Sequence, residues 1–402
     1  MNRMSQDYGG AKRLDNAAAI VARTRELAPM IEAAAPRIEA ERALTAEVLA
    51  ALHGAGLFRM LLPRSCGGAE VAPAVLMQTI VAIAKADAST AWCISQGSGV
   101  SMAAAYLKPA IAREIFGGER AVLASGTAAT PVPATIVDDG YRVTGTWRFA
   151  SGCKHADWLG GHCILGEADG TPRLGPNGAP IERTVLFPKA HARFTDTWHV
   201  IGLKGTGSDS YSVDDLFVPA DYSFTRESAA DRRETGPLYR FTTYNMFGIG
   251  FASVALGIGR AAFDAFIRLA GEKVPYLWRN ELRENAVIQS QVGMAEARLQ
   301  SARGLLLQIL HELWESASQG QSFTRDQQAA LRLASTYATH QAKDVLDFVY
   351  HAAGASAIFA SNPFERRFRD IHTVTQQVQA NASNFELVGQ HLLGLEARSK
   401  LL

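Results

Sequence analysis

Cysteine, unbalanced charge and long apolar runs are all scarce in this chain of 402 residues. Its four cysteines, Cys66, Cys93, Cys153 and Cys163, form no C-x-x-C pair, which indicates reduced thiols inside a cell. Lys and Arg (40) balance Asp and Glu (39), so the net charge of +1 gives no reason to expect nucleic acid or a membrane surface as a partner. No stretch approaches 18 apolar residues without a charge, and the first sixteen residues are polar, unlike a signal peptide. We therefore expect a cytoplasmic protein without a membrane span.

Several motifs with known chemistry are also missing. There is no H-E-x-x-H and no cluster of His and Cys at ligand spacing, so we expect no metal site. The glycine-rich stretch GLKGTGSDS (202–210) lies between β segments and matches neither G-x-G-x-x-G nor a P-loop. No serine occupies a G-x-S-x-G elbow, which argues against the usual hydrolase.

Three regions of different character follow one another, and we predict domains at residues 1–120, 121–235 and 236–402. The first is rich in Ala and Leu at helical spacing, as in TAEVLAALHGAGLF, where Gly54 and Gly56 end the helix. Two more helices are expected over APAVLMQTIVAIAKAD and TAWCISQGSGVSMAAAYL. The last of these is apolar on nearly all sides and should be buried.

The middle region reads as strands. In TIVDDGYRVTGTWRFASG, an Asp-Asp-Gly turn precedes Tyr141, Val143, Gly145, Trp147 and Phe149, which recur at a spacing of two. The segments RTVLFP and YSVDDLFVP are further strands, each closed by a proline.

The last region returns to helices and predicts a bundle of about four. Thr324 and Gln327 have the spacing of a capping box, and the helix that they open should end at Gly354. Ser383 and Glu386 repeat the box before a final helix.

Four features are candidates for a site, and each has two interpretations. Ser151 follows the strand and either satisfies a local backbone group or presents its hydroxyl to a bound ring. Arg283 and Gln291, eight residues apart, make inter-helix contacts or hold a cofactor phosphate. The small residues of HAAGASAIF (351–359) form a C-cap or allow close backbone approach. In RRFRDIHTVTQQ (366–377), Arg369, Asp370 and His372 are structural or belong to a site.

In order along the chain, these segments resemble the acyl-CoA dehydrogenase superfamily, and within it the two-component flavin-dependent monooxygenases. The matching stretches are DASTAW (87–92), WRFASGCKHADW (147–158), GLKGTGSDSYSVDDLFVP (202–219), NAVIQSQVGMAEARL (285–299), GASAIF (354–359), PFERRFRDIHT (363–373) and ELVGQHLLG (386–394). The resemblance implies an α+β fold with an N-terminal helical domain, a central β-barrel-like domain and a C-terminal four-helix bundle that mediates tetramers.

The resemblance also separates two chemistries. Many acyl-CoA dehydrogenases carry a catalytic glutamate eight residues after the Arg-Asp pair, but Val378 stands there, and residues 371–385 contain no acid. A monooxygenase is therefore favoured. That branch usually has a histidine seven residues after the pair, where this chain has Gln377, which cannot transfer a proton at neutral pH.

The resemblance implies that reduced FMN or FAD, supplied by an NAD(P)H:flavin reductase, reacts with O2 to give a C4a-hydroperoxyflavin that oxygenates a small aromatic or heteroaromatic substrate. The residues that it implies for catalysis are Ser151, His372 and Gln377. Those implied for cofactor binding are Trp147, Phe149, Ser151, Arg283, Gln291, Gly354, Ala355 and Ser356. Those implied for substrate binding are Trp92, Ser95, Gln96, Ser125 and Trp158. Two alternatives stay open: an acyl-CoA dehydrogenase with a relocated base, and an inactive interaction protein that keeps the flavin fold.

Overall fold

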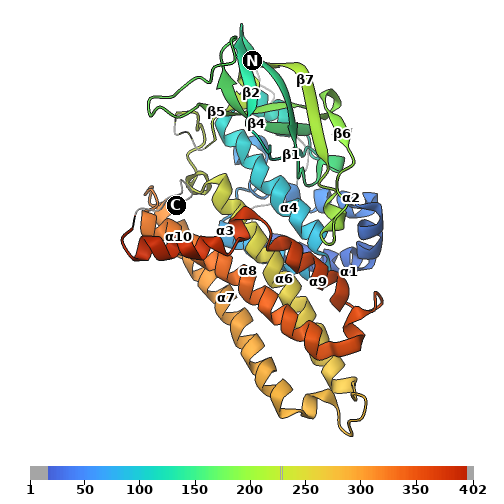
Figure 1. Cartoon of the computed structure of the whole chain (residues 1–402). Helices are drawn as coiled ribbons and strands as arrows, with labels where there is room; N and C mark the ends of the chain where they lie inside the picture. The colour runs from blue at the N-terminus through green and yellow to red at the C-terminus, as the bar shows by residue number, and fades with distance from the viewer. Residues whose placement is uncertain (1–16, 227, 229, 396–402) are drawn as a thin grey trace, which may run out of the picture.

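The protein is described here by a computed structural model, which covers residues 17–226, 228 and 230–395. The polar start of the chain, including residues 1–16 of the first expected domain, lies outside the described residues. Figure 1 shows a helical region, a β region and a long helical bundle, in the order that the sequence predicts. The helices are α1 (Ala17–Glu41), α2 (Ala46–Gly54), α3 (Pro73–Ala86), α4 (Ala88–Ser101), α5 (Pro109–Phe116), α6 (Thr243–Glu272), α7 (Ala286–Ser318), α8 (Arg325–Ala353), α9 (Phe364–Val374) and α10 (Ser383–Leu392). The strands are β1 (Leu123–Ser125), β2 (Val132–Val137), β3 (Gly140–Trp147), β4 (Trp158–Gly166), β5 (Glu182–Pro188), β6 (Arg193–Thr195), β7 (Ser210–Pro219) and β8 (Ser223–Phe224).

Helix α4 connects the sheet to the bundle. Asp87 caps its N-terminus by accepting a hydrogen bond from the Thr90 backbone N–H at 2.7 Å. The helix is buried almost all round, as its apolar sequence predicts. It packs on α3, α6 and β1, so the helix contacts both the sheet and the bundle (Figure 1).

The strands form one sheet in the order β6-β7-β3-β2-β4-β5-β8, and β1 pairs with β4. The Asp-Asp-Gly turn joins β2 to β3, as predicted, with Asp139 at φ +60°. The edge strands β6 and β8 do not pair with each other among the described residues, so the sheet is open. The alternation predicted for β3 is wrong at Phe149, because the strand already ends at Trp147. Phe149 has a φ of +59°, which turns its side chain outward, and the residue is 56% exposed.

The bundle is built on α6, which packs against α3 and α8, while α7 packs against α8. Helix α6 has the length and composition to cross a membrane, but 78% of its most apolar window is buried in the structure, as in a core helix.

Of the two predicted capping boxes, one is confirmed and one is wrong. The Thr324 and Gln327 box is present and opens α8, which ends before Gly354 as predicted. The Ser383 and Glu386 box is wrong. Helix α10 begins after Ala382, and the Ser383 backbone N–H donates instead to the Asn381 side chain at 2.9 Å.

Candidate functional site

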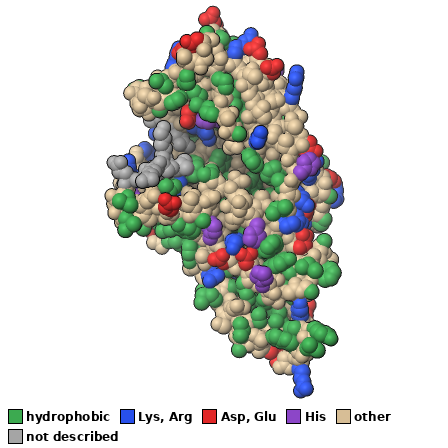
Figure 2. Space-filling view, in the orientation of Figure 1, with side chains coloured by type: hydrophobic (Ala, Val, Ile, Leu, Met, Phe, Trp, Pro, Cys, Tyr) green, Lys and Arg blue, Asp and Glu red, His purple; other side chains and the backbone are tan. Residues whose placement is uncertain are grey.

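A cavity of about 510 Å³ lies between the sheet, α4, the first turns of α6 and the segment after α9. This volume falls within the range of roughly 300–1,000 Å³ that small-molecule and cofactor sites occupy. Figure 2 shows the surface hollowed between the β region and the helices. The aromatic residues that line it are Trp92, Phe149, Trp198, Phe224, Tyr244, Phe247 and Phe251. Planar apolar walls of this kind suit a planar ring system.

A row of hydrogen-bonded side chains runs from α4 into the cavity wall. The Trp92 indole Nε1–H donates to Ser151 Oγ at 3.0 Å, and Ser151 Oγ lies 2.8 Å from Ser208 Oγ. Ser208 Oγ lies 2.7 Å from Thr206 Oγ1, and Thr206 Oγ1 donates to the Leu203 carbonyl at 2.9 Å. Trp92, Thr206 and Ser208 are each less than 5% exposed. The wall therefore presents Ser151 to the cavity with its hydroxyl tied to α4 and to the segment that carries Thr206 and Ser208.

Backbone conformation explains why Ser151 faces this way. Gly152 has a φ of +78°, which a glycine adopts without strain. The turn is pinned from the far side because the Ala150 N–H donates to the Asp209 carbonyl at 3.2 Å and the Gly152 N–H to the Thr206 carbonyl at 3.0 Å.

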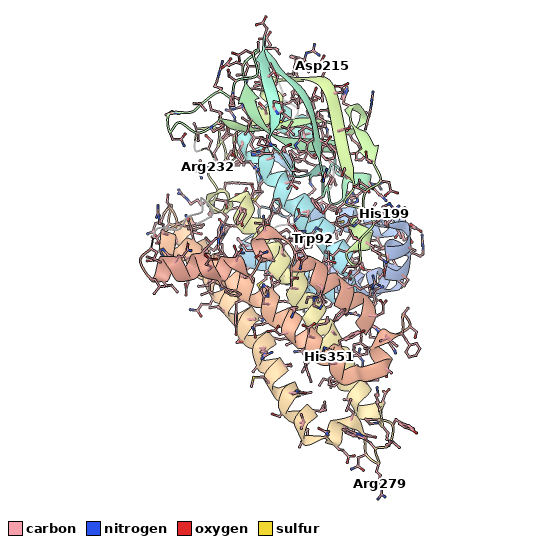
Figure 3. All side chains as sticks on the ribbon, viewed as in Figure 1. Trp92, His199, Asp215, Arg232, Arg279 and His351 are labelled. Atoms are coloured by element: carbon pink, nitrogen blue, oxygen red, sulfur yellow. The ribbon has the colours of Figure 1, made fainter. Side chains whose placement is uncertain are left out.

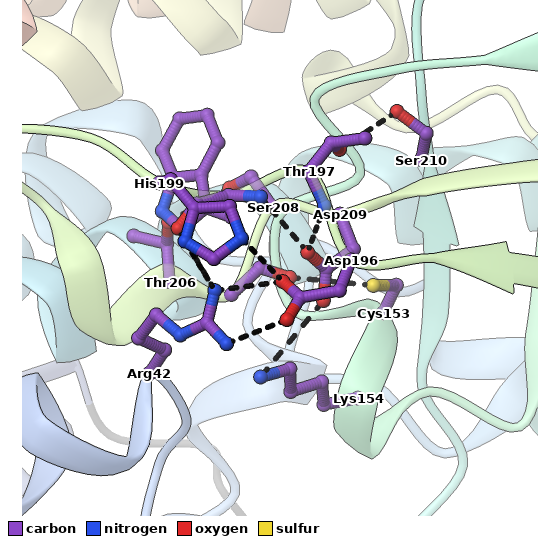
Figure 4. Close-up of polar contacts among 12 residues, drawn as sticks. Arg42, Cys153, Lys154, Asp196, Thr197, His199, Thr206, Ser208, Asp209 and Ser210 are labelled. Atoms are coloured by element: carbon purple, nitrogen blue, oxygen red, sulfur yellow. Dashed lines mark hydrogen bonds and ion pairs between the residues drawn. The ribbon is translucent and has the colours of Figure 1, made fainter.

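The loop opposite this turn is held by a buried carboxylate. Asp209 Oδ1 accepts the backbone N–H groups of Thr197 and Trp198, each at 3.1 Å, and Asp209 Oδ2 lies 3.8 Å from Lys154 Nζ (Figure 4). Beside it, Arg42 donates to the Asp196 carboxylate with both of its terminal nitrogens, from Nη1 to Oδ1 at 2.7 Å and from Nη2 to Oδ2 at 2.8 Å. The loop is thus fixed by charged hydrogen bonds on its outer side, while its hydroxyls point inward.

Four buried polar atoms at the cavity have no hydrogen-bond partner among the described residues. They are Gln96 Nε2, His162 Nδ1, Thr184 Oγ1 and Tyr244 Oη. A buried polar atom without a partner costs free energy, so native structures keep few of them unless a ligand completes the bonding. These atoms mark positions where a bound molecule would find hydrogen bonds.

One end of the cavity carries charge. His162 Nε2 lies 3.1 Å from Glu182 Oε2, and Arg226 lines the same end. Burial, together with the positive charge of Arg226, lowers the pKa of His162 despite the opposing effect of Glu182. His162 is therefore neutral at pH 7, and Glu182 is the carboxylate that lines the cavity.

The structure brings six of the residues expected at the site to the cavity wall. They are Trp92, Gln96, Ser125, Phe149, Ser151 and Gln377.

Four others lie elsewhere, for visible reasons. Trp147 is fully buried behind the wall, stacked on Tyr211, because β3 points it into the sheet's core. Ser95 faces α6, where only the missing side chain of Gly250 leaves it room. Trp158 stacks on Tyr222, and His372 bonds to Asp347 on α8 at 3.0 Å.

The remaining expected residues gather at the far end of the bundle. Lys273 Nζ donates to the Ala353 carbonyl at 2.6 Å and to Ser356 Oγ at 3.0 Å, so the turn with Gly354 and Ala355 lies beside the end of α6. Arg283 approaches the same helix end at Gly271. In Figure 3, His351 and Arg279 of this region lie well down the bundle from Trp92.

Arg283 and Gln291 do not share a continuous helix. Helix α7 begins only at Ala286, after the cap Asn285, and Arg283 lies in a short 3₁₀ turn before it. Within one chain these residues do not line the cavity.

Sequence reasoning missed the hydroxyls of Thr206 and Ser208 and the charged end formed by His162, Glu182 and Arg226. The segment GLKGTGSDS is excluded as a phosphate loop and contributes to the family resemblance, but none of its hydroxyls is predicted to reach the site. Its three hydroxyl residues within five positions were the available signal.

Comparison with known proteins gives consistent relationships. Residues 249–382 match the family model "Acyl-CoA dehydrogenase, C-terminal domain". The chain is 30% identical over 354 residues to the indole-3-acetate monooxygenase of Pseudomonas putida, covering 88% of each protein. It is 27% identical to the oxygenase component of an FADH2-dependent resorcinol hydroxylase of Rhizobium sp. (strain MTP-10005), covering 95% of each.

Known structures share the fold. XiaF from Streptomyces sp., in complex with FADH2 and glycerol, superimposes with a TM-score of 0.88 at 24% identity, covering 96% of this chain and 98% of that one. TdsC from Paenibacillus sp. A11-2, with FMN and indole, gives a TM-score of 0.78 at 21% identity, covering 95% of this chain and 99% of that one.

Proposed function

Because the chain belongs to the flavin-dependent monooxygenase branch of the acyl-CoA dehydrogenase superfamily, we propose that it binds reduced FMN or FAD from a separate NAD(P)H:flavin reductase. With O2 it would then oxygenate a small aromatic or heteroaromatic substrate. The observation that carries the proposal is the cavity itself, in which aromatic walls surround the Ser151 hydroxyl. We infer a cytoplasmic location, which the four free, buried cysteines support.

The residues present fit a flavin. The cavity has room for a cofactor ring, and Phe149 and Trp198 stand edge to face at 6.1 Å beside Ser151. Ser151 offers hydrogen bonding at the wall, and further along α4 Gln96 Nε2 has no partner among residues 17–226, 228 and 230–395. When bound, the reduced flavin would supply the electrons that activate dioxygen.

The protein's part is to hold, orient and exclude water. Ser151 would hold the ring edge through its hydroxyl, and Trp92 fixes that hydroxyl in place. The stacked pair Trp92 and Phe251, 4.3 Å apart, closes the wall against water. Gln96 and Thr184 would orient the substrate. Gln377 would form hydrogen bonds to the bound flavin or substrate, but its amide would not transfer a proton.

We further propose that the protein is a homotetramer in which a neighbouring copy supplies the cofactor phosphate site. Hydrophobic side chains are exposed at the bundle end, with Tyr276 90% and Leu277 85% exposed, and Ile358 and Phe359 nearby in the turn after α8. Figure 2 shows hydrophobic surface toward this tip. Lys273 and Arg283 beside it are suited to a phosphate. Sedimentation should show a tetramer that the double variant Tyr276→Ser, Leu277→Ser dissociates, and a monomeric wild type would contradict this.

The test of the function is an anaerobic titration with reduced FMN and FADH2, followed by oxygen and an aromatic probe such as indole. We expect reduced flavin to bind and hydroxylated product to form. Ser151→Ala should release up to about tenfold more hydrogen peroxide per product, since one hydrogen bond is worth up to about 1.4 kcal/mol. Ser301→Ala, on the exposed face of α7, is the matched control. Failure of either flavin to bind would refute the proposal.

An acyl-CoA dehydrogenase is the second candidate, because Glu182 lines the cavity and is a carboxylate. Its side chain is 63% exposed and already engaged by His162, which does not suit a general base that must reach a buried carbon. One anaerobic absorbance measurement distinguishes a dehydrogenase from a monooxygenase. A dehydrogenase would bleach bound oxidised FAD anaerobically on addition of an acyl-CoA, and a monooxygenase would not.

A further inference from the structure

The row of side chains behind Ser151 has a fixed direction of hydrogen bonding. Thr206 Oγ1 lies 2.9 Å from the Leu203 carbonyl oxygen. A carbonyl has no hydrogen to give, so the Thr206 proton must occupy this contact. The Thr206 hydroxyl then has only lone pairs left for Ser208, 2.7 Å away.

The direction passes along the row one hydroxyl at a time. Ser208 must donate its single proton to Thr206, which leaves Ser208 as the acceptor in its 2.8 Å contact with Ser151. Ser151 must therefore donate to Ser208. Its oxygen already accepts the indole N–H of Trp92 at 3.0 Å, so one lone pair is all that it can offer to the cavity.

Burial keeps this arrangement from reversing. Thr206 and Ser208 are each 2% exposed and Trp92 is 4% exposed, so water does not supply alternative partners. Rotating any hydroxyl the other way would leave two oxygens facing each other at hydrogen-bond distance without a proton between them.

We propose that the row Thr206–Ser208–Ser151 locks the Ser151 hydroxyl as a hydrogen-bond acceptor, and that this makes the cavity select a ring bearing an N–H at that edge over one bearing a lone pair. This rests on the proposed function. A reduced isoalloxazine carries an N–H at N5, whereas the oxidised ring offers a lone pair there. Thr206 and Ser208 are thus positioning residues that act through Ser151 and set the preference for reduced flavin.

The direction of hydrogen bonding also predicts which substitutions remove the preference for a ring N–H. In Thr206→Val, Ser208 loses its acceptor and turns its proton toward Ser151, which frees the Ser151 proton for the cavity. In Ser208→Ala, Ser151 loses its acceptor directly. Thr206→Ser keeps the hydroxyl and the direction, and is the matched control.

The experiment measures the dissociation constants of reduced and oxidised FMN for each protein under anaerobic conditions, with thermal melting to confirm folding. We expect the wild type and Thr206→Ser to favour reduced FMN by the same factor. Thr206→Val and Ser208→Ala should each lower that factor by about tenfold, which corresponds to about 1.4 kcal/mol, the upper part of the range for one hydrogen bond. For a two-electron couple, this shifts the midpoint potential of the bound flavin by about 30 mV downward.

The outcomes are distinguishable. If FMN binds but the ratio is the same in the folded valine and alanine variants as in the wild type, the inference is overturned while the proposed function stands. If Thr206→Ser loses the preference as fully as Thr206→Val, volume rather than proton direction is responsible, which also overturns it. If no flavin binds the wild type, the proposed function itself has failed.

Discussion

The Asp370 side chain on α9 accepts the backbone N–H of Leu203 at 2.6 Å, across 167 residues of sequence. Leu203 has a φ of +52°, an uncommon conformation for a leucine, and begins the loop that carries Thr206 and Ser208. Asp370 thereby ties the bundle to the hydroxyl row of the cavity. It lies near Asp87, the cap of α4, so two buried carboxyl groups face the same interior region.

This contact predicts a pH dependence of stability. Burial, reinforced by Asp87, raises the pKa of Asp370 to about 7 against the hydrogen bond from Leu203. A carboxyl with a raised folded-state pKa contributes stability that is present below the unfolded value near 4 and is lost as the pH rises toward 7. Asp370→Asn keeps an acceptor for Leu203 but cannot ionise. We expect it to flatten the fall in the free energy of unfolding between pH 4 and 7, measured by urea denaturation. An unchanged slope would mean that Asp370 does not titrate in this range.

Gln96→Leu separates a binding role from a structural one. Gln96 Nε2 is buried without a partner in the part of the chain that the structure describes, so its loss should leave the melting temperature unchanged or slightly higher. If Gln96 orients the substrate, KM should rise by about tenfold while flavin affinity stays constant. Steady-state kinetics with the reductase and a flavin titration check both. A variant with an unaltered KM would remove Gln96 from substrate binding.

Gly257→Ala should destabilise the contact between α3 and α6. A Cβ at this position would lie 2.5 Å from Ala84 Cβ and 2.7 Å from the Val81 carbonyl oxygen. Overpacking of this kind costs about 1–3 kcal/mol. Gly304→Ala on α7 is the control, because no atom of the described residues lies within 4 Å of its Cβ position and alanine favours a helix. Chemical denaturation should show a loss for the first and a small gain for the second.

Thr324 and Ser383 were both expected to cap a helix, so alanine substitutions at these two positions can be compared directly. Thr324→Ala removes a real cap of α8 and should cost about 1 kcal/mol of unfolding free energy. Ser383→Ala removes a side chain that makes no capping bond to α10, and should cost almost nothing. Equal losses in both variants would contradict this assignment.

Much of the fold follows from local sequence rules. Helix periodicity, the Asp-Asp-Gly turn, the Thr324 cap and the Gly354 stop depend on residues close in the chain, and all four are confirmed. The Ser383 box failed because Asn381, two residues earlier, takes the backbone N–H that the box would have engaged.

The site was harder to predict because it is tertiary. Six expected residues line the cavity, but Trp147, which the resemblance implies for cofactor binding, is fully buried behind the wall, because a motif does not say which face of a strand meets a ligand. The link from Trp92 to Ser151 spans 59 positions, and no local rule anticipates it. Nor does spacing reveal that Lys273 holds the turn after α8 through Ala353 and Ser356.

The hydroxyl row joins α4, the turn after β3 and the loop before β7, and Asp370 fastens that loop to α9. These parts are spread over residues 92–370, so the ligand-binding wall forms only when segments far apart in the chain have packed together. Ligand occupancy would therefore protect distant segments from proteolysis together, and a cut in any one of them would abolish binding.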